Sequence, residues 1–252
     1  MIITLLALTA VVAAIRGLWS PCGLSMLSAL NPIAERARGH RFWVTALWYL
    51  AGGLVGGAVL GGALAGGAAL VGLASWPAAV TWSLAIAAAA TALASDVRLG
   101  GWQLPDHPRQ VDERWLTTYR RWIYAGGFGV QIGAGFATYV MTAGVYLLAA
   151  LAVLSGAPSM AFASGVLFGA VRGSTIVLAG WAQTPDRLSR LMARVDVLTG
   201  ASVALAVGAE LVVGAGAAWA LAGPAAGVGA AVLLAAVTAY ATRAGRRAVA
   251  TS

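Results

Sequence analysis

Long apolar stretches alternate with short polar segments along the whole chain. A helix needs about 20 apolar residues to cross the hydrocarbon core of a bilayer. The uncharged run over residues 42–95 is too long for one span, and Trp76-Pro77 marks the turn within it. The pattern therefore predicts an all-α, polytopic membrane bundle of about seven transmembrane helices, over residues 2–30, 43–72, 78–95, 123–154, 160–181, 197–221 and 225–242.

The composition agrees with a membrane protein and argues against nucleic-acid binding. Of the 252 residues, 60% are hydrophobic and 10% are charged, whereas about a quarter of the residues of a soluble domain are charged. The net charge of +8 comes from sixteen Arg, and the chain has no Lys. Because these Arg lie mostly in short segments between apolar runs, we expect the lipid bilayer, and no nucleic acid, as the partner.

The distribution of Arg predicts the orientation. Fourteen of the sixteen Arg lie in residues 31–41, 96–122 and 182–196 and in the C-terminal tail, which seven spans place on one side of the membrane. The opposite connections, near residues 73–77, 155–159 and 222–224, carry no charge. Since Arg-bearing loops stay cytoplasmic, we expect a plasma-membrane protein with its N-terminus outside and its C-terminus in the cytoplasm.

A weak internal repeat divides the chain. At an offset of 117 residues, Trp19-Ser20-Pro21-Cys22 aligns with Phe136-Ala137-Thr138-Tyr139. We therefore expect one membrane domain, 1–252, made of a three-helix half (1–95), a cytoplasmic loop (96–122), a second three-helix half (123–221), and an extra helix with a basic tail (222–252). Three helices is an odd number, so the second half would be inverted, and transporters built this way bind substrate between the repeats.

The segment Gly17-Leu18-Trp19-Ser20-Pro21-Cys22-Gly23-Leu24 resembles the first-helix signature of the CcdA/DsbD transmembrane family, within the LysE-like transporter group. The resemblance implies inverted three-helix halves, transfer of reducing equivalents, a thioredoxin-like partner, and two cysteines. Cys22 matches the first cysteine, but Thr138-Tyr139-Val140 stand where the second is expected. One thiol forms no internal disulfide, so either Cys22 works with a partner's thiol or the scaffold serves another task; we favour the second.

Three ionisable residues fall within predicted spans, namely Arg16, Arg172 and Glu210. A charge at the bilayer centre costs about 2.5–3.5 kcal/mol by insertion measurements, and such residues mark either interior ion pairs or substrate and proton pathways. Pro21 would break the first helix near Arg16 and expose backbone carbonyls, as in broken-helix binding sites. The predicted solute- or ion-binding residues are Arg16, Ser20, Pro21, Cys22, Thr138, Arg172 and Glu210.

Other chemistry is not expected. A single cysteine excludes an intramolecular disulfide and a cysteine-rich metal site. His40 and His107 lie in polar loops without a second ligand at metal spacing. No phosphate-binding loop, catalytic triad or paired-carboxylate motif occurs, so we expect no cofactor, no metal and no enzymatic activity.

Paired glycines such as Gly52-Gly53 and Gly56-Gly57 recur in the second span and predict close helix packing.

Three functions remain open. A transporter for a small anionic or polar solute, or an ion, would bring Arg16, Arg172 and Glu210 together at a cavity with Pro21. A thiol-redox conduit would expose Cys22 to a water-accessible cavity and a partner protein. A non-transporting membrane assembly factor would have a dry, fully packed interior.

Overall fold

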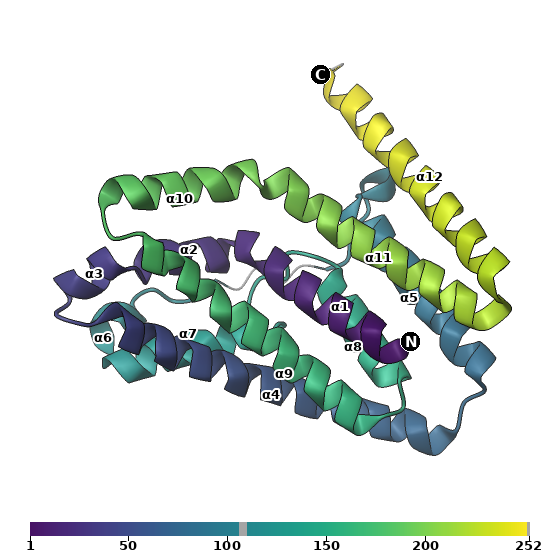
Figure 1. Cartoon of the computed structure of the whole chain (residues 1–252), viewed down its shortest axis with the longest axis horizontal. Coiled ribbons are helices and arrows are strands. Elements are labelled where there is room, and N and C mark those ends of the chain that lie inside the picture. Colours follow the sequence, from purple (N-terminus) through teal and green to yellow (C-terminus); the bar gives the residue numbers. More distant parts are fainter. Residues whose placement is uncertain (106–109, 251–252) are drawn as a thin grey trace.

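The computed structural model describes residues 1–105 and 110–250, with side chains described as far as residue 239. This part of the chain is helical and contains no strand (Figure 1). Its α-helices are α1 (Ile2–Arg16), α2 (Pro21–Ala29), α3 (Pro32–Ala37), α4 (Phe42–Ala74), α5 (Ala78–Asp96), α6 (Trp115–Thr118), α7 (Arg121–Gly133), α8 (Gly144–Leu154), α9 (Pro158–Ser174), α10 (Pro185–Val197), α11 (Thr199–Ala222) and α12 (Pro224–Ala250). Three short 3-10 helices join them, η1 (Gly17–Trp19), η2 (Leu99–Gly101) and η3 (Thr175–Trp181).

Five of the described helices are long and apolar enough to cross a membrane: Ile2–Trp19, Phe42–Ala74, Ala78–Asp96, Pro158–Trp181 and Thr199–Ala222. Two shorter apolar helices, Gly144–Leu154 and Pro224–Ala239, follow the same order as the remaining predicted spans. The prediction of an all-α membrane bundle is therefore confirmed.

The predicted continuous span over residues 123–154 is wrong. Helix α7 ends at Gly133, and α8 begins at Gly144. Between them Gly135 adopts a φ of 71°, a left-handed conformation that glycine reaches without strain and that ends a helix. The first span is interrupted as expected, since Ser20 is extended and its hydroxyl caps α2 by accepting from the Gly23 amide at 3.1 Å.

The segment 183–196, expected to be a loop, is also helical. Thr184 caps the N-terminus of α10 and Pro185 occupies its first position, both favourable at a helix start. Leu188, Leu191, Met192 and Val195 face inward while three Arg point outward. The expectation failed because a search for long apolar runs does not detect a short helix that is apolar on one face only.

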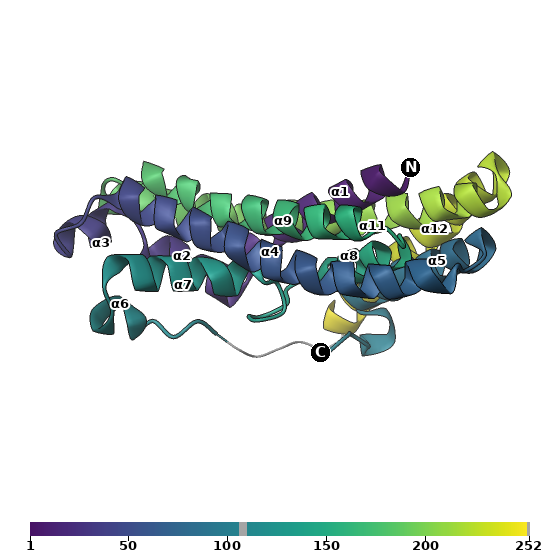
Figure 2. The same cartoon turned by 90° about the horizontal axis from the view of Figure 1, so that it is seen from below.

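Helix α4 packs between α9 and α7 (Figure 2). A Cβ atom added at Gly52 or Gly56 would lie 2.1 or 2.2 Å from a carbonyl oxygen of α7. One added at Gly53, Gly57 or Gly61 would lie 2.4–2.9 Å from a carbonyl oxygen of α9. These glycines therefore permit the close helix approach that the sequence predicts.

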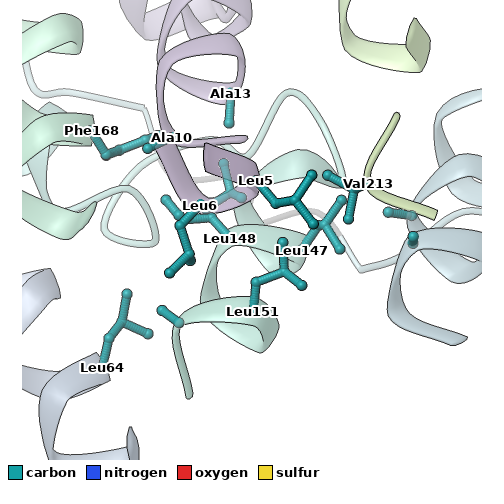
Figure 3. Close-up of a cluster of buried hydrophobic side chains, with 14 of the residues drawn as sticks. Leu5, Leu6, Ala10, Ala13, Leu64, Leu147, Leu148, Leu151, Phe168 and Val213 are labelled. Atoms are coloured by element: carbon teal, nitrogen blue, oxygen red, sulfur yellow. The ribbon is translucent and has the colours of Figure 1, made fainter. Parts of the chain in front are cut away.

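Helices α1 and α8 fill the space next to α4 with a dry apolar core (Figure 3). Leu5 and Leu6 of α1 meet Leu147, Leu148 and Leu151 of α8, and all five side chains are buried. This core holds the ends of α1 and α8 next to the polar residues described below.

Three of the charged segments gather at one end of the bundle. Helices α3 and α6 and the start of α10 lie together at the left of Figure 1, and the α4–α5 and α11–α12 turns lie at the right. This arrangement suits a multi-pass membrane protein. Which end faces the cytoplasm stays a prediction.

Candidate functional site

A polar cavity of about 140 Å³ lies where four helical segments end or break. Its walls come from the C-terminus of α1, the C-terminus of α5, the α7–α8 break with the start of α8, and α11. Its polar side chains include Arg16, Asp96, Arg98, Thr142 and Tyr146. Helix ends and breaks leave backbone groups unpaired, so such a place favours binding of polar groups.

Asp96 is the anchored acid of this cavity. Its carboxylate accepts a hydrogen bond from the Thr142 hydroxyl and another, of 2.7 Å, from the Ala143 amide. Ala143 immediately precedes α8, so the carboxylate lies at the positive end of that helix. The sequence assigned Asp96 to the cytoplasmic loop. Its position as the last residue of an apolar helix was the one signal that could have indicated this site.

Arg16 lines the same cavity from α1. Its side chain is buried, and its Nη1 donates to the Ser202 hydroxyl of α11 at 3.2 Å. Asp96 is the acid that interacts with it electrostatically, although no direct ion pair between them occurs in the described residues. Arg16 and Asp96 share this cavity without forming an ion pair. Both side chains can therefore contact a bound molecule.

Glu210 lies behind this cavity, at the middle of α11. Its side chain is 2% exposed, and no described residue donates a hydrogen bond to either carboxyl oxygen. It borders a void of about 10 Å³ that Thr142 also lines. Thr142 therefore stands between Glu210 and the larger cavity.

Arg172 forms a second cluster, on the other side of α1. Helix α1 packs between α9, which carries Arg172, and α11. The Arg172 side chain is 4% exposed, its Nη2 donates to the Ser20 hydroxyl at 3.3 Å, and its guanidinium carbon lies 5.9 Å from the centre of the Phe168 ring. A Cβ at Gly17 would lie 1.0 Å from Arg172 Nη1, so only glycine leaves room for this guanidinium.

Two groups that ionise lie close to this arginine. Tyr49 and Cys22 are fully or almost fully buried and within electrostatic range of Arg172. Its Nε has no hydrogen-bond acceptor among the described residues.

The predicted site residues thus divide into two groups. Arg172, Ser20 and Cys22 lie together beside the α1–α2 break, whereas Arg16 and Glu210 lie on the α11 side of α1. Pro21 opens α2 and is exposed; Thr138 is buried in the α7–α8 break, with a hydroxyl that has no partner in the described residues. The cavity expected to bring Arg16, Arg172 and Glu210 together with Pro21 is therefore not found. Arg16 lines one cavity, and Arg172 lies in a separate packed cluster.

A buried acid at the charged end was also missed. Glu35 accepts hydrogen bonds from Arg38 at 2.7 Å, from Tyr124 at 3.1 Å and from the Thr45 hydroxyl. These contacts tie the 31–41 segment to α4 and α7, which indicates a structural role. No sequence signal marked this residue, because Glu35 stands in a polar segment.

In the described residues, no group of three or more His, Cys, Asp and Glu side chains is placed to hold a metal ion. His107 lies outside the described residues, and His40 is partly exposed near the end of the 31–41 segment.

Comparison with known proteins gives one relative. The chain is 29% identical over 170 residues to the methylamine utilization protein MauF of Paracoccus versutus. The match covers 65% of this chain and 60% of MauF, so the chain spans less than two thirds of its relative's length. No family description matches the chain, and no solved structure matches it significantly.

Proposed function

We propose that this protein transports a small polar solute across the membrane on a CcdA/LysE-like scaffold. The observation that carries the proposal is the polar cavity where α1, α5 and the α7–α8 break meet, because buried charges around a cavity in a membrane bundle are expensive and usually functional. A non-transporting membrane assembly factor is the alternative, and it predicts a dry interior at this place.

The two helix breaks support the scaffold. The break before α2 and the break between α7 and α8 fall on the segments that align at the 117-residue offset. Broken helices at matching positions of two halves mark the binding region in transporters built from inverted repeats.

The cavity limits the size and chemistry of the solute. At about 140 Å³ it is close to the roughly 150 Å³ that admits a benzene-sized molecule. Arg16 would bind an anionic group, and Asp96 a cationic or hydrogen-bond-donating group. The relative MauF bears methylamine utilization in its name, so methylammonium is a suitable first probe, with acetate as the anionic counterpart.

Access to the cavity tests the proposal first. In a Cys22→Ala background, Met141→Cys places a thiol on the cavity wall, and Leu148→Cys places a matched thiol in the dry core. Water-soluble thiol reagents should modify Met141→Cys in vesicles at least tenfold faster than Leu148→Cys. Replacing Arg16 by Gln should reduce any preference for negatively charged reagents.

Transport itself is measured in reconstituted vesicles with labelled methylammonium and labelled acetate. We expect saturable uptake of at least one probe, reduced tenfold or more by Arg16→Gln or Asp96→Asn. Uptake no faster than in protein-free vesicles, together with an unreactive Met141→Cys, would refute the proposal.

A thiol-redox conduit is the second candidate, favoured by the position of Cys22 close to the buried Arg172 side chain. It requires a partner protein of thioredoxin type to supply the second thiol. A Cys22→Ser variant with full activity would exclude it, and a trapped mixed disulfide at Cys22 would establish it.

A further inference from the structure

We propose that Asp96 and Glu210 form a carboxyl pair that holds one proton inside the membrane, and that transport through the adjoining cavity is coupled to this proton. The coupling rests on the proposed transport function, whereas the proton-binding pair does not.

The pair is built from two helices that pack side by side. Glu210 lies at the middle of α11, Asp96 is the last residue of α5, and α5 and α11 form one of the larger helix contacts of the bundle. Thr142 links the two acids, because its hydroxyl donates to Asp96 and the same residue borders the void beside Glu210. While both are ionised, neither can donate, which is why Glu210 has no donor among the described residues. A single proton between them supplies the missing donor.

The hydrogen bonds around Asp96 indicate where the proton lies. Both of its oxygens already accept from donors, the Thr142 hydroxyl and the Ala143 amide. Asp96 is thus already held as a hydrogen-bond acceptor. The void beside Glu210 is otherwise lined by apolar residues, and its two hydroxyls donate elsewhere, Thr142 to Asp96 and Thr9 to the Leu5 carbonyl. The proton therefore resides on Glu210 and is donated to Asp96.

The charge balance requires the same proton. The helices packed on α11 are α1, α5, α10 and α12. Arg16 of α1 lines the cavity with Asp96, the charged side chains of α10 are all exposed, and residues 224–239 of α12 include no ionisable side chain. Arg98 and Tyr146 line the cavity and are partly or largely exposed. One buried arginine thus balances one carboxylate, and a second carboxylate, 2% exposed, would be uncompensated.

This arrangement allows the proton on Glu210 to be exchanged for a cationic group of the solute. When a cationic group of a solute binds Asp96, it takes the place of the proton's positive charge, and Glu210 loses its acceptor. The O–H bond of Glu210 breaks and its proton passes to cavity water, while the cationic group of the solute balances the second carboxylate, the first being balanced by Arg16. Departure of the solute returns one proton to Glu210 and leaves the net charge of the site unchanged.

The proton is tested by infrared spectroscopy on the full chain in lipid, with ¹³C-labelled glutamate. The chain contains three Glu, so the labelled carbonyl band of a protonated acid is simple to assign. We expect this band at neutral pH, its loss in Glu210→Gln, and its persistence in Glu113→Gln, a matched change at an exposed position.

Coupling between the two acids is tested with Asp96→Asn. Removing the neighbouring carboxylate should lower the pH at which the labelled band disappears by at least one unit. This variant also keeps the test decisive if Glu210→Gln does not fold. Absence of the band at neutral pH, its persistence in Glu210→Gln, or an unchanged titration in Asp96→Asn would each overturn the proposal. Because the spectra need no solute, failure of the transport proposal would not affect them.

Discussion

The contact between α4 and α7 leaves no room for a side chain at Gly56. A Cβ there would lie 2.2 Å from the Val130 carbonyl oxygen and 2.8 Å from the Ala134 nitrogen, whereas ordinary van der Waals contact begins at 3.4 Å. Both neighbours are backbone atoms, so no rotamer change can relieve the clash, and Gly56→Ala must push α7 away from α4.

The magnitude follows from two opposing effects. Overpacking of this kind costs about 1–3 kcal/mol, while Gly→Ala in a helix interior gains about 1 kcal/mol from propensity. Gly62→Ala is the matched control, because Gly62 lies on the same helix with no atom within 4 Å of the added Cβ. Gly62→Ala should therefore show only the stabilising gain in helix propensity.

The two variants are compared by thermal unfolding of purified protein in the same detergent. We expect Gly56→Ala to lower the unfolding midpoint by several degrees relative to Gly62→Ala, which should equal or exceed the wild type. Equal midpoints for the two variants would show that the α4–α7 interface is not held at this separation, and the packing argument would fail.

Three further predictions concern other parts of the chain. Glu35→Ala should destabilise the protein by roughly 3–5 kcal/mol, measured by the same unfolding assay, because it leaves buried partners without their acceptor. Gly17→Ala should displace the Arg172 guanidinium and lower the unfolding midpoint, while Gly200→Ala, with no atom within 4 Å of the added Cβ, should not lower it. Asp112→Asn should leave the midpoint unchanged at neutral pH, although the hydrogen bond from Arg114 lowers the Asp112 pKa, because the pair is exposed to solvent.

The apolar runs located the long helices well. The predicted spans 43–72, 78–95 and 197–221 differ by only one or two residues at most ends from α4, α5 and α11. Helix α10 and the α7–α8 break were not found, because the first is apolar on one face only and the second lies in a stretch whose hydrophobicity hides the turn at Gly135.

The sequence by itself determined that this chain is a membrane helix bundle, because composition and the length of apolar runs suffice for that conclusion. It also marked Arg16, Arg172 and Glu210 as unusual, since charge within a span is visible without a structure. Which of them share a site depends on helix packing. Only the tertiary structure brought Asp96 and Thr142 to Arg16 and Glu210 and left Arg172 with Ser20, because residues far apart in the sequence meet through the rotation and depth of neighbouring helices.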